Sequence, residues 1–159
     1  MEAGVLAGEY RGRLLELLLE KGFEWEQELW EHPVESKRLG VCGRVDLVLV
    51  VGGEAVVVET KLSASERSMK CNPGLVAQVA AYAIAVEESL RLPARRAIIY
   101  SIEEDRLYEL AIGPLQRMLA VRAAEELWKL LRSPEPPCTP QRLWRCRVCM
   151  YRGECPCTL

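Results

Sequence analysis

The spacing of apolar residues changes twice in the first third of the chain, and the changes predict its first elements. Residues 5–21 carry leucines at helical spacing and predict an amphipathic helix. Two valine-rich runs follow, at residues 44–51 and 54–61, and each is typical of a strand. Gly52-Gly53 separates the runs and suits a two-residue turn, so the pair predicts a β-hairpin.

The remaining pattern alternates between helix and strand. The further predicted elements are an extended segment around 33–36, a loop at 62–73, a helix at 74–90, strands at 96–102 and 106–112 and a helix at 114–131. Helices that alternate with strands favour a mixed sheet flanked by helices, which is an α/β sandwich. We expect a core over residues 1–132, followed by a proline-rich linker and a small cysteine-rich module over residues 133–159.

Composition narrows the class of protein. The chain has 159 residues, 50% of them hydrophobic, a formal net charge of −2 and a pI near 5.6. It is therefore expected to fold, and any nucleic-acid contact must come from a local basic patch. No apolar run reaches the about 18 residues that a membrane helix needs. The first residues do not resemble a secretory signal, so a cytoplasmic location and no membrane partner are expected.

The hairpin carries the strongest chemical signal. Asp46 lies six residues before Gly52, and Glu59 lies six residues after Gly53, so the two carboxylates should face each other across the ladder. Lys61 shares the face of Glu59, because residues two apart in a strand point the same way. Glu-x-Lys alone is usually structural, but its combination with Asp46 and a hairpin is much less common.

Two facing carboxylates repel unless a cation joins them. Mg²⁺ or Mn²⁺ binds such oxygen ligands and keeps open positions for phosphate oxygens. A metal held by Asp46 and Glu59 could polarise a phosphodiester, and Lys61 could stabilise the charge that develops. The hairpin therefore predicts a metal-dependent nuclease or another phosphate-processing enzyme.

The helix after the hairpin adds two polar residues. Gln78 and Tyr82 are four apart and share one helical face, where they could hydrogen-bond a phosphate or stack on a base. A half-buried helix with its polar face in solvent is the competing interpretation.

Five of the seven cysteines lie between Cys138 and Cys157, which favours metal or cluster ligation over disulfides. Cys146, Cys149 and Cys155 form the ligand set, and Cys138 or Cys157 could be its fourth member. An iron–sulfur cluster, zinc and unliganded thiols all stay open on spacing alone.

Arginines surround these cysteines and could hold DNA, although a solvated basic tail is the alternative. They are Arg145, Arg147 and Arg152.

Together these motifs resemble a known family. Gly43-Arg44-Val45-Asp46, Glu59-Thr60-Lys61, Gln78 with Tyr82 and the terminal cysteines are similar, in that order, to the PD-(D/E)XK nucleases of the RecB type. Within that superfamily they resemble the CRISPR-associated RecB-like exonucleases, the fourth numbered Cas family.

The resemblance implies a restriction-endonuclease-like core and a DNA nuclease that uses Mg²⁺ or Mn²⁺ on single-stranded ends. It also implies an iron–sulfur cluster, with zinc as the alternative, a role in spacer processing with CRISPR integrase proteins, and possible homo-oligomers. The family often has a metal-binding His in its first helix, where this chain has Glu16, which we interpret as either a ligand or helix surface. A weak or inactive DNA- or partner-binding module and a repair nuclease unrelated to CRISPR remain alternatives.

Overall fold

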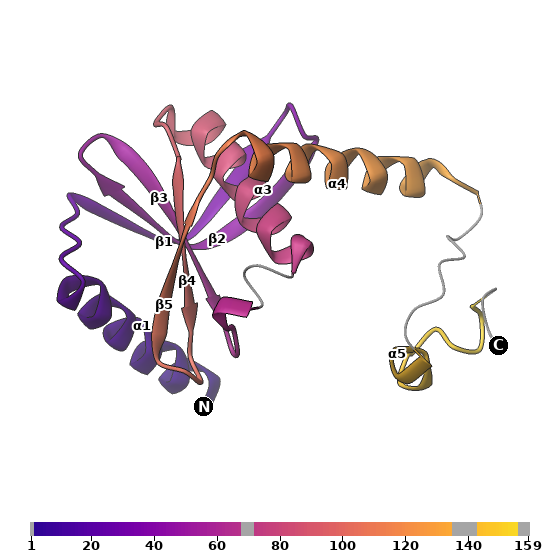
Figure 1. Ribbon diagram of the computed structural model, residues 1–159, viewed down its shortest axis with the longest axis horizontal. Coiled ribbons are helices and arrows are strands. Elements are labelled where there is room, and N and C mark those ends of the chain that lie inside the picture. The colour runs from indigo at the N-terminus through magenta and orange to yellow at the C-terminus, as the bar shows by residue number, and fades with distance from the viewer. Residues whose placement is uncertain (1, 68–71, 135–142, 156–159) are drawn as a thin grey trace. The chain divides into compact units, whose positions relative to one another are not determined.

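A five-stranded mixed sheet of order β1-β2-β3-β4-β5 forms the centre of the computed structural model (Figure 1). The structure describes residues 2–67, 72–134 and 143–155. Its strands are β1 (Gln27–Ser36), β2 (Val41–Val51), β3 (Glu54–Lys61), β4 (Arg96–Ser101) and β5 (Arg106–Ala111). Its helices are α1 (Glu2–Glu20), α3 (Pro73–Leu90), α4 (Pro114–Arg132) and α5 (Leu143–Arg147). The chain divides into two compact units, residues 1–124 and residues 125–159.

Strand pairing follows from the length of each connection. Short turns join β1 to β2, β2 to β3 and β4 to β5, and these pairs are antiparallel. β3 and β4 are parallel, because the connection between them is long enough to hold α3. The predicted hairpin is therefore confirmed, and β2 and β3 lie inside the sheet rather than at an edge.

Helices α1 and α3 cover opposite faces of the sheet (Figure 1). Leu14 and Leu18 of α1 pack on one face, against a cluster that includes Val56 and Val58. The other face packs against α3 and includes Val57. Because β3 is buried on both faces, its unbroken valine run is expected for an interior strand.

The helix α3 begins as its sequence predicts. The Asn72 side chain accepts a hydrogen bond from the Leu75 N–H, and Pro73 occupies the first turn. The start of α4 is fastened to the end of α3, because the Arg117 guanidinium donates to both oxygens of Glu87 at 2.7 and 2.8 Å.

The prediction of a mixed sheet flanked by helices is confirmed, and two strands are longer than predicted. β1 spans Gln27–Ser36 rather than the neighbourhood of 33–36, and β2 begins at Val41 rather than at residue 44. β1 is an edge strand with several exposed glutamates and Pro33, so its composition hides its strand character.

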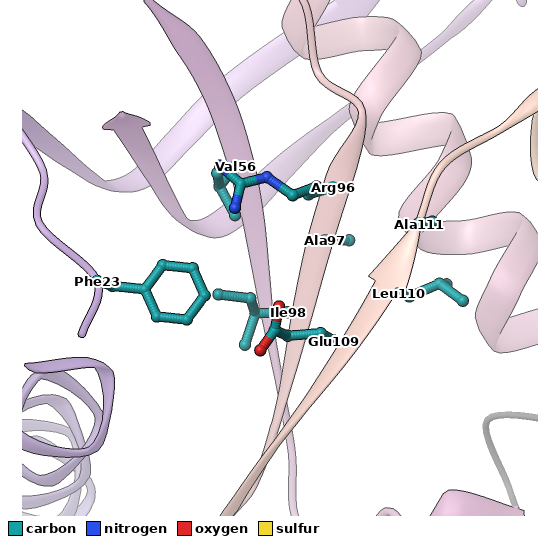
Figure 2. Close-up of a pocket in the computed structure, with 8 residues that line it drawn as sticks. All are labelled: Phe23, Val56, Arg96, Ala97, Ile98, Glu109, Leu110 and Ala111. Atoms are coloured by element: carbon teal, nitrogen blue, oxygen red, sulfur yellow. The ribbon is translucent and has the colours of Figure 1, made fainter. Parts of the chain in front are cut away.

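Figure 2 shows a pocket that none of the predicted site residues lines. Its lining residues are Phe23, Val56, Arg96, Ala97, Ile98, Glu109, Leu110 and Ala111. Across the described segments, we find no helix with the length and apolar character to cross a bilayer.

Candidate active site

The ladder between β2 and β3 ends where the predicted carboxylates begin. Leu47 and Val58 form its last pair, and the next facing positions in the same register are Asp46 and Glu59. The Asp46 carboxylate takes the place of the missing ladder partner, because its Oδ2 accepts the Thr60 N–H at 2.7 Å. The structure thus brings Asp46 to the end of β3, beside Glu59.

Glu59 is a buried carboxylate, with only 5% of its surface exposed. Burial raises the pKa of Glu59 above its ordinary value, the hydrogen bond from Lys61 lowers it, and the charge of Asp46 raises it again. The Oε1 atom accepts hydrogen bonds from Lys61 Nζ at 2.7 Å and from Gln78 Nε2 at 2.8 Å. The Oε2 atom is buried and has no partner among the described residues. An ionised oxygen left without a donor in this way is costly.

Lys61 and Gln78 close a triangle of hydrogen bonds with Glu59. The Lys61 amine donates to the Gln78 amide oxygen at 3.1 Å as well as to Glu59. Lys61 keeps 32% of its side chain exposed, so its amine stands between the buried carboxylate and solvent. The arrangement holds a partly exposed cationic donor against the buried Glu59 carboxylate.

Gln78 and Tyr82, expected together on one face of α3, have different surroundings. Gln78 contacts the hairpin residues directly. Tyr82 is half-buried and lies against Gly43, where an added Cβ would stand 3.0 Å from its ring. Packing therefore explains the glycine at position 43, because only a residue without a side chain lets the Tyr82 ring lie this close to β2.

The donor set fits one hard divalent cation. Asp46 and Glu59 carry hard oxygen donors and lie side by side, and no described residue donates a hydrogen bond to the buried Glu59 Oε2. Within residues 2–67, 72–134 and 143–155, no three His, Cys, Asp or Glu side chains are grouped to hold a metal. Two carboxylates with water in the remaining positions is the usual state of protein-bound Mg²⁺.

Glu16 is not part of this group. Its carboxylate pairs with Arg13 on the same helix at 3.2 Å, and 66% of its side chain is exposed. The structure therefore places Glu16 on the helix surface, which was one of the two interpretations of its sequence position.

The predicted cysteine ligands are only partly covered by the structure. Cys146 lies in α5 and its carbonyl accepts the Cys149 N–H, while Cys155 follows the next turn. The described residues show no metal-binding group here, and Cys138 and Cys157 lie outside them. The cysteine-rich module is thus not confirmed.

The arginines that the sequence singled out in the tail belong to the second unit. Arg145 and Arg147 lie in α5, and Arg152 follows it; all three side chains are exposed.

Three residues beside the site were not predicted from the sequence. The Arg11 guanidinium lies 4.8 Å from the centre of the Trp30 ring and donates to the Glu31 carboxylate at 3.0 Å. Glu31 and Asp46 are the two positions that the β1–β2 pairing skips, between the pairs Trp30–Leu47 and His32–Val45, and Glu31 has a positive φ of 49°. The sequence does not predict these positions, because the Arg11–Glu31 contact joins residues 20 apart and no sequence pattern indicates the positive φ of Glu31.

Comparison with known proteins identifies the family of the chain. The model of the PD-(D/E)XK nuclease superfamily matches residues 4–156, and the chain belongs to this superfamily. A similar protein is the CRISPR-associated exonuclease Cas4 of Aeropyrum pernix, which is 35% identical over 143 residues. The match covers 87% of this chain and 71% of that relative, and the chain is accordingly a Cas4-like nuclease of the RecB type. The chain is also similar to the crystal structure of SSO0001, at 24% identity and a TM-score of 0.47, over 99% of this chain and 72% of that one.

Proposed function

We propose that this nuclease hydrolyses DNA phosphodiesters with Mg²⁺ or Mn²⁺ bound by Asp46 and Glu59. The observation that carries the proposal is the buried Glu59 Oε2, which lies near a second carboxylate and has no hydrogen-bond donor among the residues that the structure describes. Members of the superfamily typically use such ions, and a bound ion would supply Lewis-acid polarisation of the scissile phosphate.

The protein's own groups have separate tasks in this proposal. Asp46 and Glu59 hold the cation, and the Thr60 N–H fixes the orientation of Asp46. Lys61 binds Glu59 while part of its side chain stays exposed, and it would orient water or stabilise charge on the phosphate in the transition state. Gln78 fixes the side chains of Glu59 and Lys61 relative to each other, because it forms a hydrogen bond with each.

The substrate in this proposal is the end of a single DNA strand. The support is the similarity to a protein named as a CRISPR-associated exonuclease. Tyr82, which lies against Gly43, would stack on a base. In the second unit, the exposed Arg145, Arg147 and Arg152 would bind phosphates. By the same likeness we propose a role in spacer processing in the cytoplasm, alongside integrase proteins, with homo-oligomers as a possible assembly.

The C-terminal cysteines are proposed to hold an iron–sulfur cluster, with zinc as the alternative metal. Cys146, Cys149 and Cys155 would be three ligands, with Cys138 or Cys157 as the fourth. Metal analysis and visible absorbance of anaerobically purified protein distinguish the two, because a cluster absorbs visible light and zinc does not. Protein with neither metal after anaerobic purification would refute this part.

A cleavage assay on end-labelled DNA tests the catalytic proposal. Single-stranded and duplex DNA are incubated with Mn²⁺, with EDTA as the metal control. We expect cleavage that needs Mn²⁺ and is lost in Asp46→Asn and Glu59→Gln. Glu109→Gln, an exposed carboxylate on the edge strand β5, is the matched control and should keep wild-type activity. A folded protein that cuts no DNA in Mn²⁺ or Mg²⁺ would favour the binding module over the enzyme.

A further inference from the structure

The side chains of β2 change faces at Asp46. In a regular strand, residues three apart point to opposite faces of the sheet. Val45 and Val48 nevertheless both belong to the core on the α3 face, while Leu47 belongs to the core on the α1 face. The alternation therefore shifts by one position between Val45 and Leu47, and Asp46 is the residue at the shift.

The neighbouring strand β1 shifts in the same place. Leu29 and Val34, five apart, both pack on the α3 face, although regular alternation would separate them. Trp30 packs on the α1 face, so the change lies between Trp30 and Val34. The register of the two strands is the same on both sides of the change: Trp30 pairs with Leu47 before it, and His32 pairs with Val45 after it.

Glu31 lies at the centre of this matched change. The regular pairing skips it together with Asp46, the position that the same register would place opposite it. Its φ of 49° is in the left-handed region that residues other than glycine disfavour. Something must hold it there. The Arg11 guanidinium does so, because it donates to the Glu31 carboxylate at 3.0 Å while it stacks on the Trp30 ring.

We propose that Glu31 is a positioning residue for the metal ligand Asp46. Its left-handed backbone lets β1 change phase together with β2. That change turns the Asp46 carboxylate into the plane of the sheet, where its Oδ2 meets the Thr60 N–H at 2.7 Å. With an undistorted β1, β2 would keep its alternation and Asp46 would point with Val48 toward α3. The inference rests on the proposed function, in which Asp46 binds the cation.

The backbone and side chain of Glu31 can be tested separately. Glu31→Gly removes the carboxylate but adopts the left-handed conformation without cost. Glu31→Val removes the carboxylate and strongly disfavours that conformation, and Glu31→Ala disfavours it less. Asp105→Val is the matched control: Asp105 also has a positive φ, of 47°, and also binds an arginine of α1, but it lies in the turn between β4 and β5.

Mn²⁺ binding by isothermal titration calorimetry is the first measurement, with thermal unfolding as the check that each variant is folded. We expect Glu31→Gly to bind Mn²⁺ close to the wild type. Glu31→Val should bind about 10–100-fold more weakly, the usual effect of removing a group that orients a metal ligand. Glu31→Ala should lie between them, and it carries the test if the valine variant does not fold. Asp105→Val should bind like the wild type.

Two results would overturn the inference. One is wild-type Mn²⁺ affinity in folded Glu31→Val or Glu31→Ala. The other is a loss in Glu31→Gly as large as in the valine variant, which would assign the effect to the carboxylate and not to the backbone. Failure of the proposed function looks different, because then the wild type would bind no Mn²⁺ or Asp46→Asn would bind it equally well.

Discussion

Replacement of Glu59 by glutamine should make the metal-free protein more stable while it removes the activity. Glu59 is 5% exposed, its Oε2 has no hydrogen-bond partner among the described residues, and its charge lies beside that of Asp46. Glutamine keeps the shape and the Oε1 acceptor that Lys61 and Gln78 use. It also removes the buried negative charge and its repulsion by the Asp46 carboxylate.

The size of the effect follows from that one oxygen. An unsatisfied buried polar atom costs about 1–3 kcal/mol, and we assign the lower end because glutamine is itself a polar group in the same place. A gain of about 1 kcal/mol raises the melting temperature of a chain of this size by about 2–4 °C. A cation at 100 times its Kd stabilises the wild type by about 2.7 kcal/mol, or about 5–10 °C. The order of stability should therefore invert when Mn²⁺ is added.

The pH dependence has a definite sign. The pKa of Glu59 is raised, mainly by burial, so the folded protein favours the protonated carboxyl. The destabilisation is then present above the folded-state pKa and disappears as the pH falls toward 4.5, the ordinary value. The stability advantage of Glu59→Gln should accordingly be largest near neutral pH and shrink under acid conditions.

Differential scanning fluorimetry of both proteins, with EDTA or with Mn²⁺ and at several pH values, measures all three effects. A Glu59→Gln variant that melts below the wild type in EDTA at neutral pH would contradict this account of the buried carboxylate. Equal stabilisation of the variant and the wild type by Mn²⁺ would contradict it too, because Glu59 would then contribute no ligand.

Three other changes test separate parts of the structure. Gln78→Leu removes a hydrogen bond to each of two catalytic side chains and should lower kcat by about 10–100-fold with little change in KM for DNA; unchanged steady-state kinetics would contradict this role. Gly43→Ala pushes against the Tyr82 ring, 3.0 Å from the new Cβ, and should cost about 1–3 kcal/mol in urea unfolding; Tyr82→Ala should relieve most of that cost in a double mutant. Arg117→Ala should cost about 2 kcal/mol and leave cleavage unchanged. Burial by itself would raise the pKa of Glu87, but hydrogen bonds from Arg117 and Ala94 lower it. The loss of unfolding free energy in Arg117→Ala should therefore be full above pH 4.5 and fade as the pH falls through the lowered pKa. A loss that does not depend on pH would argue against the ion pair.

The geometry of the hairpin that carries the proposed site could be predicted from the sequence because its turn is short. A two-residue turn at Gly52-Gly53 fixes which residues face each other, and counting back from it places Asp46 opposite Glu59. Lys61 then follows from the two-residue period of a strand. These are local rules, and they hold because β2 and β3 are adjacent in both sequence and space.

The contacts of the hairpin with other elements could not be read in this way. The helix α3 is apolar on most of its surface, so its sequence does not show that Gln78 meets Glu59 and Lys61. The length of the edge strand β1 could not be predicted, because charged residues interrupt its apolar pattern. The Arg11–Glu31 pair depends on how α1 packs on the sheet, and a leucine-rich helix can present the same residues at several rotations.

The proposed metal ligand Glu59 owes its unfavourable position to the strand that contains it. Val56, Val57 and Val58 are fully buried, and β3 has β2 and β4 on its two sides. A carboxylate that continues such a strand is desolvated before any ligand arrives, which raises its pKa and leaves one oxygen without a donor. The same desolvation strengthens its attraction for a cation. The features that weaken the metal-free fold and those that would bind the metal therefore have one physical origin, and a substitution at Glu59 should not relieve the first without losing the second.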